Sequence, residues 1–152
     1  YEHERCDQEN GTGPVAVITL DAPPVNALDS SAYFDLYEAM YDFAVDDNVA
    51  VVVITGAGER AFMAGADVKE FLKFNRQTGT TYTRKNSGVR EYIRQFPQAG
   101  DLAINGLALG GGCALALACD IRIACQGEFS LSEINMGILG GIPYAASIIA
   151  NG

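Results

Sequence analysis

Apolar runs and amphipathic stretches alternate along this chain. Residues 15–20 and 49–56 are rich in β-branched apolar side chains and are bounded by turn-forming residues, which predicts two strands. Residues 30–47 have helical spacing, with Asp29 or Ser30 as the N-cap. The apolar face of this predicted helix consists of Tyr33, Leu36, Tyr37, Met40 and Ala44. Because residues 49–56 show no alternation, we expect that strand to be buried on both faces of its sheet.

The second half of the chain continues this alternation. Residues 67–96 are predicted to be mostly helical, except that the polar, Thr-rich segment 74–86 is expected to be a mobile surface segment. The remaining predicted elements are strands over 102–105, 120–124 and 128–131 and a helix over 110–118. Strands that alternate with helices indicate an α/β fold whose sheet is covered on both sides, without an internal sequence repeat.

Composition limits the number of domains and the class of partner. A chain of 152 residues that is 49% hydrophobic and 19% charged is expected to form one domain, over residues 1–152. Its net charge of −9 argues against nucleic acid and anionic membranes as partners. The apolar run 102–118 contains Asn105 and three glycines, so a buried strand followed by a buried helix explains it better than a membrane span.

The cysteines and the one histidine do not indicate a metal site. The four cysteines include no C-x-x-C pair, and the histidine lies in a polar N-terminal segment. These residues are Cys6, Cys113, Cys119, Cys125 and His3. Reduced thiols and the absence of a visible signal peptide lead us to expect a cytoplasmic protein without a bound metal.

Three consecutive glycines, residues 110–112, interrupt the apolar run. Close packing of a helix on a strand explains one glycine easily and three poorly. A dinucleotide-binding loop is a second possibility, since residues 56–61 fit G-x-G-x-x-A after a strand, but Gly65 interrupts the helix that should follow. The third is an anion hole, in which glycines let a ligand reach free amides at a helix N-terminus. The Gly- and Ala-rich turn before Asp67 then offers a second amide, that of Ala66.

Four motifs in order carry a resemblance to a known family. Residues 17–28, 59–71, 104–124 and 129–138 resemble the enoyl-CoA hydratase/isomerase (crotonase) superfamily. The resemblance implies a crotonase-like spiral of ββα units and an acyl-CoA thioester substrate, with coenzyme A as part of the substrate and no separate cofactor. It also implies a homotrimer or a dimer of trimers. The family continues with C-terminal helices, so this chain is expected to be truncated before them.

The resemblance further implies roles for individual residues. Ala66 and Gly111 match the family's two oxyanion-hole amides, and Glu133 matches a catalytic glutamate. The implied substrate-binding residues are Ala66, Asp67, Val68, Lys69, Gly110, Gly111 and Gly141. Arg60, Lys69 and Lys73 are basic residues that could meet the CoA phosphates or could belong to a solvated helix face.

One position departs from the hydratases that hold a water molecule with two glutamates. Ala114 stands where the first glutamate is expected, and Glu133 matches the second. A single glutamate at the second position resembles the arrangement in Δ3,Δ2-enoyl-CoA isomerases. We therefore expect an enzyme that stabilises a thioester enolate and either hydrates an enoyl-CoA or moves its double bond. The alternatives are an enzyme similar to hydroxycinnamoyl-CoA hydratase-lyases and a non-catalytic acyl-CoA-binding or assembly subunit. Asp101, in an otherwise apolar strand, has no explanation at this level.

Overall fold

The computed structural model describes residues 2–6, 14–97, 99–125 and 128–137. Its strands are β1 (Glu2–Cys6), β2 (Val15–Leu20), β3 (Ala27–Leu28), β4 (Val51–Gly56), β5 (Ala61–Met63), β6 (Gly65–Ala66), β7 (Ala99–Ile104), β8 (Leu107–Leu109), β9 (Ile121–Ala124) and β10 (Phe129–Ser130). Its helices are α1 (Ser30–Ala44), α2 (Val68–Phe71), α3 (Arg76–Arg94), α4 (Gly111–Ala116) and the 3₁₀ helix η1 (Ser132–Met136).

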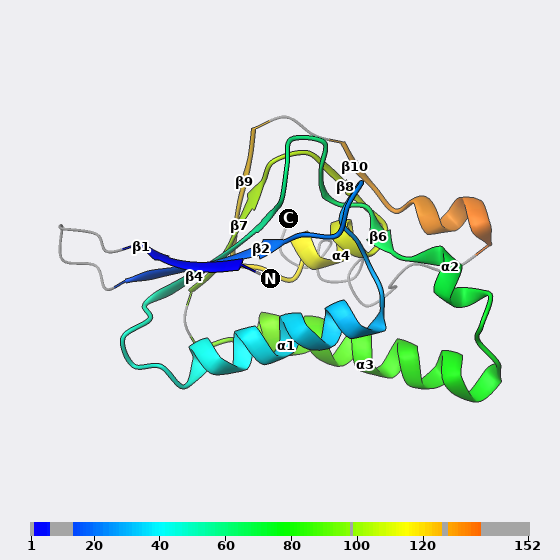
Figure 1. The fold of residues 1–152 in the computed structure, drawn as a ribbon, viewed down its shortest axis with the longest axis horizontal. Helices are drawn as coiled ribbons and strands as arrows, with labels where there is room; N and C mark the ends of the chain where they lie inside the picture. The colour runs from blue at the N-terminus through cyan, green and yellow to red at the C-terminus, as the bar shows by residue number, and fades with distance from the viewer. Residues whose placement is uncertain (1, 7–13, 98, 126–127, 138–152) are drawn as a thin grey trace.

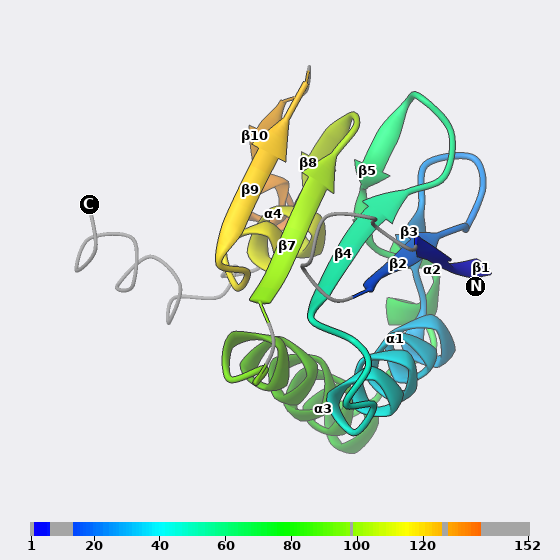
Figure 2. The same cartoon turned by 90° about the vertical axis from the view of Figure 1, so that its left-hand side faces the viewer.

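The chain winds as a spiral. Each turn contributes one strand of a large sheet, followed by short strands and then a helix. The large sheet has the order β1-β2-β4-β7-β9, and every pair in it is parallel except β1 with β2. A smaller parallel sheet has the order β10-β8-β5, and β3 pairs with β6. Figure 2 shows β4, β7 and β9 continuing into β5, β8 and β10. These repeated units confirm the predicted α/β spiral.

The main core lies between the large sheet and the helices α1 and α3, which run side by side (Figure 1). Alternate residues of β2 and β4 are fully buried, and those between them are partly exposed. Ile18, Ile54 and Leu102 from the sheet join Leu36 of α1 in one cluster. The prediction that residues 49–56 are buried on both faces is therefore wrong, because the core helices pack on one face only. All four residues of β9 are exposed, so the sheet is not covered on both sides in the described residues.

The predicted elements occur, with shifted ends. Residues 15–20 match β2 throughout. The helix predicted over 30–47 begins as expected, with Asp29 as the N-cap accepting a hydrogen bond from Ala32 N at 2.9 Å, but it ends at Ala44. The predicted segments 49–56, 102–105, 110–118, 120–124 and 128–131 correspond to β4, β7, α4, β9 and β10. The short strands β3, β5, β6 and β8 were not predicted, because two or three residues carry no periodicity.

The Thr-rich segment 74–86 is helical, which corrects the prediction of a mobile surface segment. Asn75 caps α3 by accepting from the backbone amides of Gln77 and Thr78, and the Thr78 hydroxyl accepts from Asn75 N in return. The later threonine hydroxyls donate to carbonyls one turn earlier. A reciprocal cap therefore starts a helix from a sequence that composition alone assigns to a loop.

The apolar run 102–118 is divided among β7, β8 and α4. Within the residues that the structure describes, none of the helices combines the length and apolarity needed to cross a membrane.

Asn26 joins the first turn of the spiral to the second. It is buried, with a positive φ of 53°, and its side-chain oxygen accepts from Ala22 N at 3.1 Å. Its side-chain nitrogen donates to the carbonyls of Ala57, Ala61 and Phe62 at 3.0, 2.8 and 3.3 Å. This amide therefore fixes the entry to α1 against the loop and strand that follow β4.

Candidate active site

Two glycine-containing turns approach each other where β6 and α4 begin. Gly65 has φ +97° and Gly110, the N-cap of α4, has φ +52°, conformations that favour glycine. A Cβ placed on Gly65 would lie 3.0 Å from Leu109 O and 3.1 Å from Gly111 N. The two turns are therefore in backbone contact, which a side chain on Gly65 would prevent.

The amides of Ala66 and Gly111 border one small space between these turns. Asp67 N donates to Leu28 O at 2.9 Å, and successive amides of a strand point to opposite sides, so Ala66 N points away from β3. Gly111 is the first residue of α4, so its amide has no acceptor within the helix. A Cβ placed on Gly111 would lie 3.6 Å from Ala66 N. Two amides placed in this way can stabilise one negatively charged oxygen.

The carboxylate of Glu133 lies directly over the glycine turn. Its Cδ is 3.3 Å from the Cβ position of Gly110, and its Oε2 and Oε1 are 3.4 and 3.5 Å from that point. Gly110 N donates to Ser130 O at 2.7 Å, which holds the turn against the strand that leads into η1. Oε2 is buried and has no hydrogen-bond partner among the described residues. A buried acceptor of this kind requires a donor, and a proton on the substrate or on water can supply it.

Tyr33 is the residue of this site that the sequence interpretation missed. It lies on α1, is only 2% exposed, and its hydroxyl oxygen is 2.6 Å from the Cβ position of Gly111. Sequence periodicity assigned Tyr33 to the apolar face of a helix and gave its hydroxyl no role. The available signal was the residue type, because a tyrosine at a buried helix position brings a hydroxyl group into the interior.

Burial keeps two thiols, one on α4 and one in the turn that follows it, in their neutral forms. Burial, followed by the negative charge of Glu133, raises the pKa of the Cys113 thiol, and burial raises the pKa of the Cys119 thiol to about 12. Thiols in this state are poor nucleophiles. The described residues contain no cluster of His, Cys, Asp and Glu arranged to hold a metal ion. Glu133 is the carboxylate that lies beside the glycine turn in the described residues.

The predicted CoA-binding residues lie at the start of α2. Asp67 caps this helix by accepting from Lys69 N at 3.0 Å, and the side chains of Val68 and Lys69 are exposed. Glu70 accepts a hydrogen bond from Ser30 N at 3.0 Å, which joins α2 to the beginning of α1. Arg60 and Lys73 are exposed. The start of this helix is exposed and follows Ala66 closely in the chain.

Two features interpreted from sequence lie outside the site. Residues 56–61 connect β4 to β5 and open no helix, so the dinucleotide-loop interpretation is wrong. Asp101 lies in β7, between β4 and β9, with a buried Oδ1 that has no hydrogen-bond partner among the described residues. Its negative charge contributes to the raised pKa of Cys119, after burial and Asp120, and the structure gives no further account of it.

Comparison with known proteins gives the family. Residues 10–149 match the family model described as enoyl-CoA hydratase/isomerase. The chain belongs to this family. It is 42% identical over 130 residues to a probable enoyl-CoA hydratase of Bacillus subtilis and 37% identical over 131 residues to the short-chain-enoyl-CoA hydratase of Clostridium acetobutylicum. These matches cover 84% and 85% of this chain and 50% of each relative, so the chain spans about half the length of the curated relatives it matches.

Solved structures of the enoyl-CoA hydratase/isomerase family share this fold. The crystal structure of an enoyl-CoA hydratase/carnithine racemase from Magnetospirillum magneticum has a TM-score of 0.85 and 31% identity, and the match covers 96% of this chain and 55% of that chain. In our structure, Ala66, Gly111 and Glu133 lie at one place, as the motifs predicted, and their catalytic roles stay predictions. Lys69 is exposed on α2, and Gly141 lies outside the described residues.

Proposed function

We propose that the protein processes acyl-CoA thioesters by stabilising an enolate at the Ala66 and Gly111 amides. The observation that carries this proposal is the buried oxygen of Glu133, which has no hydrogen-bond partner among the described residues and lies beside the same glycine turn that presents the Gly111 amide. A thioester enolate carries its charge on oxygen, and removal of one donor to such an oxygen costs roughly 3–4 kcal/mol of transition-state stabilisation. Glu133 moves the proton at the carbon next to the thioester carbonyl. The coenzyme A part of the substrate lies along the exposed start of α2.

The reaction that we propose first is addition of water to an enoyl-CoA, or its reverse. The two relatives described above are named as enoyl-CoA hydratases, which supports this choice. Isomerisation of the double bond is the second candidate, because Ala114 supplies a methyl group where a second carboxylate would hold the water. Ala114 is 5% exposed and is packed within α4. Coenzyme A enters as part of the substrate, and we propose no separate cofactor.

We also propose that the full protein assembles through subunit contacts, as a trimer or a dimer of trimers. Apolar side chains are exposed on the strands β9 and β10 at the far edge of the sheets. Ile121, Ile123 and Phe129 are 53%, 67% and 48% exposed. Exposed apolar residues favour association with another surface, which is either a neighbouring subunit or the part of the relatives' length that this chain does not span.

The test of the function is Glu133→Gln in the full natural chain, assayed with crotonyl-CoA for hydration and 3-hexenoyl-CoA for isomerisation. Glutamine keeps the shape and removes the base, so we expect turnover to fall roughly 10²–10⁴-fold. Affinity for the CoA ester should stay near wild type, because the carboxylate does not hold the coenzyme. Glu128→Gln, at an exposed position just before β10, is the matched control. Equal turnover of wild type and Glu133→Gln would contradict the proposed role, and inactivity of the wild type on both substrates would favour the binding-subunit alternative.

A further inference from the structure

The hydroxyl of Tyr33 lies at the same space as the two candidate oxyanion amides. Of the atoms outside its own stretch of chain, the three nearest to the Cβ position of Gly111 are Tyr33 Oη at 2.6 Å, Gly65 Cα at 3.5 Å and Ala66 N at 3.6 Å. A phenol oxygen and an amide nitrogen from distant parts of the sequence thus border the same point. The space that any side chain on Gly111 would fill is therefore lined by hydrogen-bonding groups.

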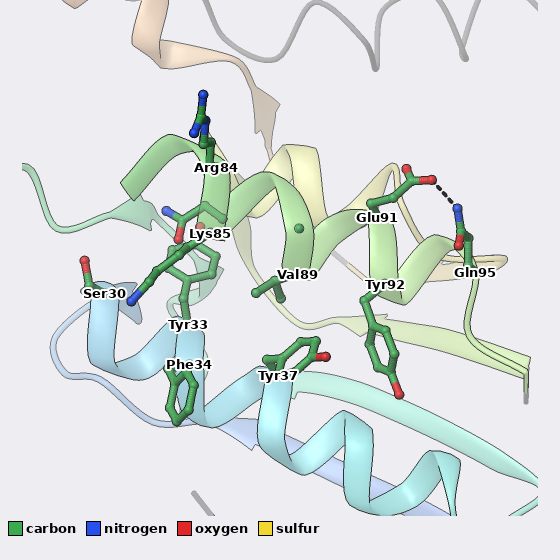
Figure 3. A pocket seen from close by; sticks show the side chains of 12 residues that line it. Ser30, Tyr33, Phe34, Tyr37, Arg84, Lys85, Val89, Glu91, Tyr92 and Gln95 are labelled. Carbon is green, nitrogen blue, oxygen red and sulfur yellow. Dashed lines mark hydrogen bonds between the residues drawn. The ribbon is translucent and has the colours of Figure 1, made fainter. Parts of the chain in front are cut away.

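The placement of this hydroxyl is set by helix packing. On α1 the other buried positions, Leu36, Met40 and Phe43, are apolar and belong to the core cluster. Tyr33 lies one turn earlier, where α1 passes the start of α4, and its ring also forms part of the wall of a cavity of about 480 Å³ between α1 and α3 (Figure 3). The ring is held between core and cavity, and its hydroxyl ends at Gly111.

We propose that Tyr33 is a further catalytic residue, which donates a third hydrogen bond to the thioester oxygen beside the amides of Ala66 and Gly111. This inference rests on the function proposed above. A phenol is both donor and acceptor, and its proton rotates to follow the charge that develops on a neighbouring oxygen. Tyrosine hydroxyls are among the side-chain donors used in oxyanion holes. The bond strengthens as the carbonyl becomes an enolate, so its effect falls on turnover rather than on binding.

Tyr33→Phe tests the inference, because it removes the donor and keeps the ring. Tyr37→Phe is the matched control: Tyr37 is one turn further along α1, lines the same cavity and packs against Tyr92 with ring centroids 4.9 Å apart. In the full natural chain we expect kcat of Tyr33→Phe to fall roughly 10²-fold, the loss typical of one oxyanion donor, with KM within about twofold of wild type. The control should keep wild-type kcat.

A second measurement separates a donor from a packing role. Bound acetoacetyl-CoA ionises to an enolate that is followed by its ultraviolet absorbance, and the pH midpoint of this ionisation reports how well the site stabilises the enolate oxygen. The midpoint should rise in Tyr33→Phe, stay unchanged in Tyr37→Phe, and fall when 3-fluorotyrosine, a more acidic phenol, replaces Tyr33. A merely structural role would change the melting temperature without shifting this midpoint.

The outcomes separate this inference from the function on which it rests. If the wild type neither turns over enoyl-CoA substrates nor ionises bound acetoacetyl-CoA, the proposed function fails and the role of Tyr33 fails with it. If the wild type does both, and Tyr33→Phe matches it in kcat and in the ionisation midpoint, only the role of Tyr33 is overturned. A Tyr33→Phe protein that melts like wild type, turns over slowly and has a raised midpoint supports the third donor.

Discussion

Alanine substitution at the neighbouring glycines 111 and 112 should affect different properties: stability at Gly112 and turnover at Gly111. A methyl group on Gly112 would overlap the Met63 carbonyl oxygen of β5 and lie 2.9 Å from Met63 C and 3.0 Å from Met63 Cβ. The nearest atoms belong to the backbone of a buried strand, which cannot move aside. We expect Gly112→Ala to lower the free energy of unfolding by about 1–3 kcal/mol, the usual cost of overpacking, or by more.

A methyl group on Gly111 meets a side chain instead. Its nearest neighbour is Tyr33 Oη at 2.6 Å, the end of a side chain, which must shift to make room. Gly111 is helical, so alanine there reduces the freedom of the unfolded chain and offsets the overlap by about 0.4–1 kcal/mol. We therefore expect Gly111→Ala to melt within about 1 kcal/mol of wild type. Because the methyl occupies the space beside Ala66 N, kcat should fall roughly 10²-fold or more.

Thermal or denaturant unfolding and steady-state turnover of the two variants form the assay. Adding Tyr33→Phe to Gly111→Ala removes the overlapping oxygen, so the double variant should regain melting temperature without regaining kcat. The reasoning is refuted if Gly112→Ala melts like wild type while Gly111→Ala unfolds, or if Gly111→Ala keeps full turnover. In that case the three glycines would serve packing alone.

Two further predictions concern buried polar groups away from the reacting atoms. Asn26→Ala leaves three carbonyls and one amide without the Asn26 side chain as their partner, so it should lower the free energy of unfolding by about 2–4 kcal/mol in urea denaturation. The control is Asn48→Ala, whose exposed side chain donates to Asp46, and its free energy of unfolding should stay within about 0.5 kcal/mol of wild type. Equal losses in the two variants would contradict the joining role of Asn26. Burial raises the pKa of Cys119 from 9.0 to about 12, so the folded state keeps this proton while the unfolded state loses it, and stability should fall as pH rises from 9 towards 12. Cys119→Ala should flatten this part of the stability curve, and an unchanged curve would count against the buried thiol as its source.

Much of the fold could be predicted from periodicity, since β2 and α1 have strong patterns and the motifs carry the order of units. The helix start at Asn75 was missed because a reciprocal cap, rather than composition, decides it. The short strands β5, β6 and β8 exist only through their partners, so no local signal predicts them. The single-face burial of β4 was missed because an apolar run does not tell which faces of a sheet other elements cover.

The candidate site was predictable to the extent that its residues lie in motifs. Ala66, Gly111 and Glu133 were identified from the resemblance, and the structure brings them to one place. Tyr33 was missed because its proposed role depends on a contact between α1 and α4, which are far apart in the sequence. The pattern of α1 shows which residues are buried, and only the structure shows what a buried hydroxyl touches.

The spiral winding has a consequence for how the site comes into being during folding. Tyr33 comes from the first turn of the spiral, Ala66 from the second, Gly111 from the third and Glu133 from the fourth. Parallel strands joined by crossovers make mostly long-range contacts, and such topologies fold slowly because distant segments must meet before any contact is gained. All four turns must therefore be in place before these four groups come together, both on the ribosome and during refolding. Recovery of acetoacetyl-CoA ionisation during refolding should therefore lag behind recovery of helical circular dichroism, which α1 and α3 can supply early.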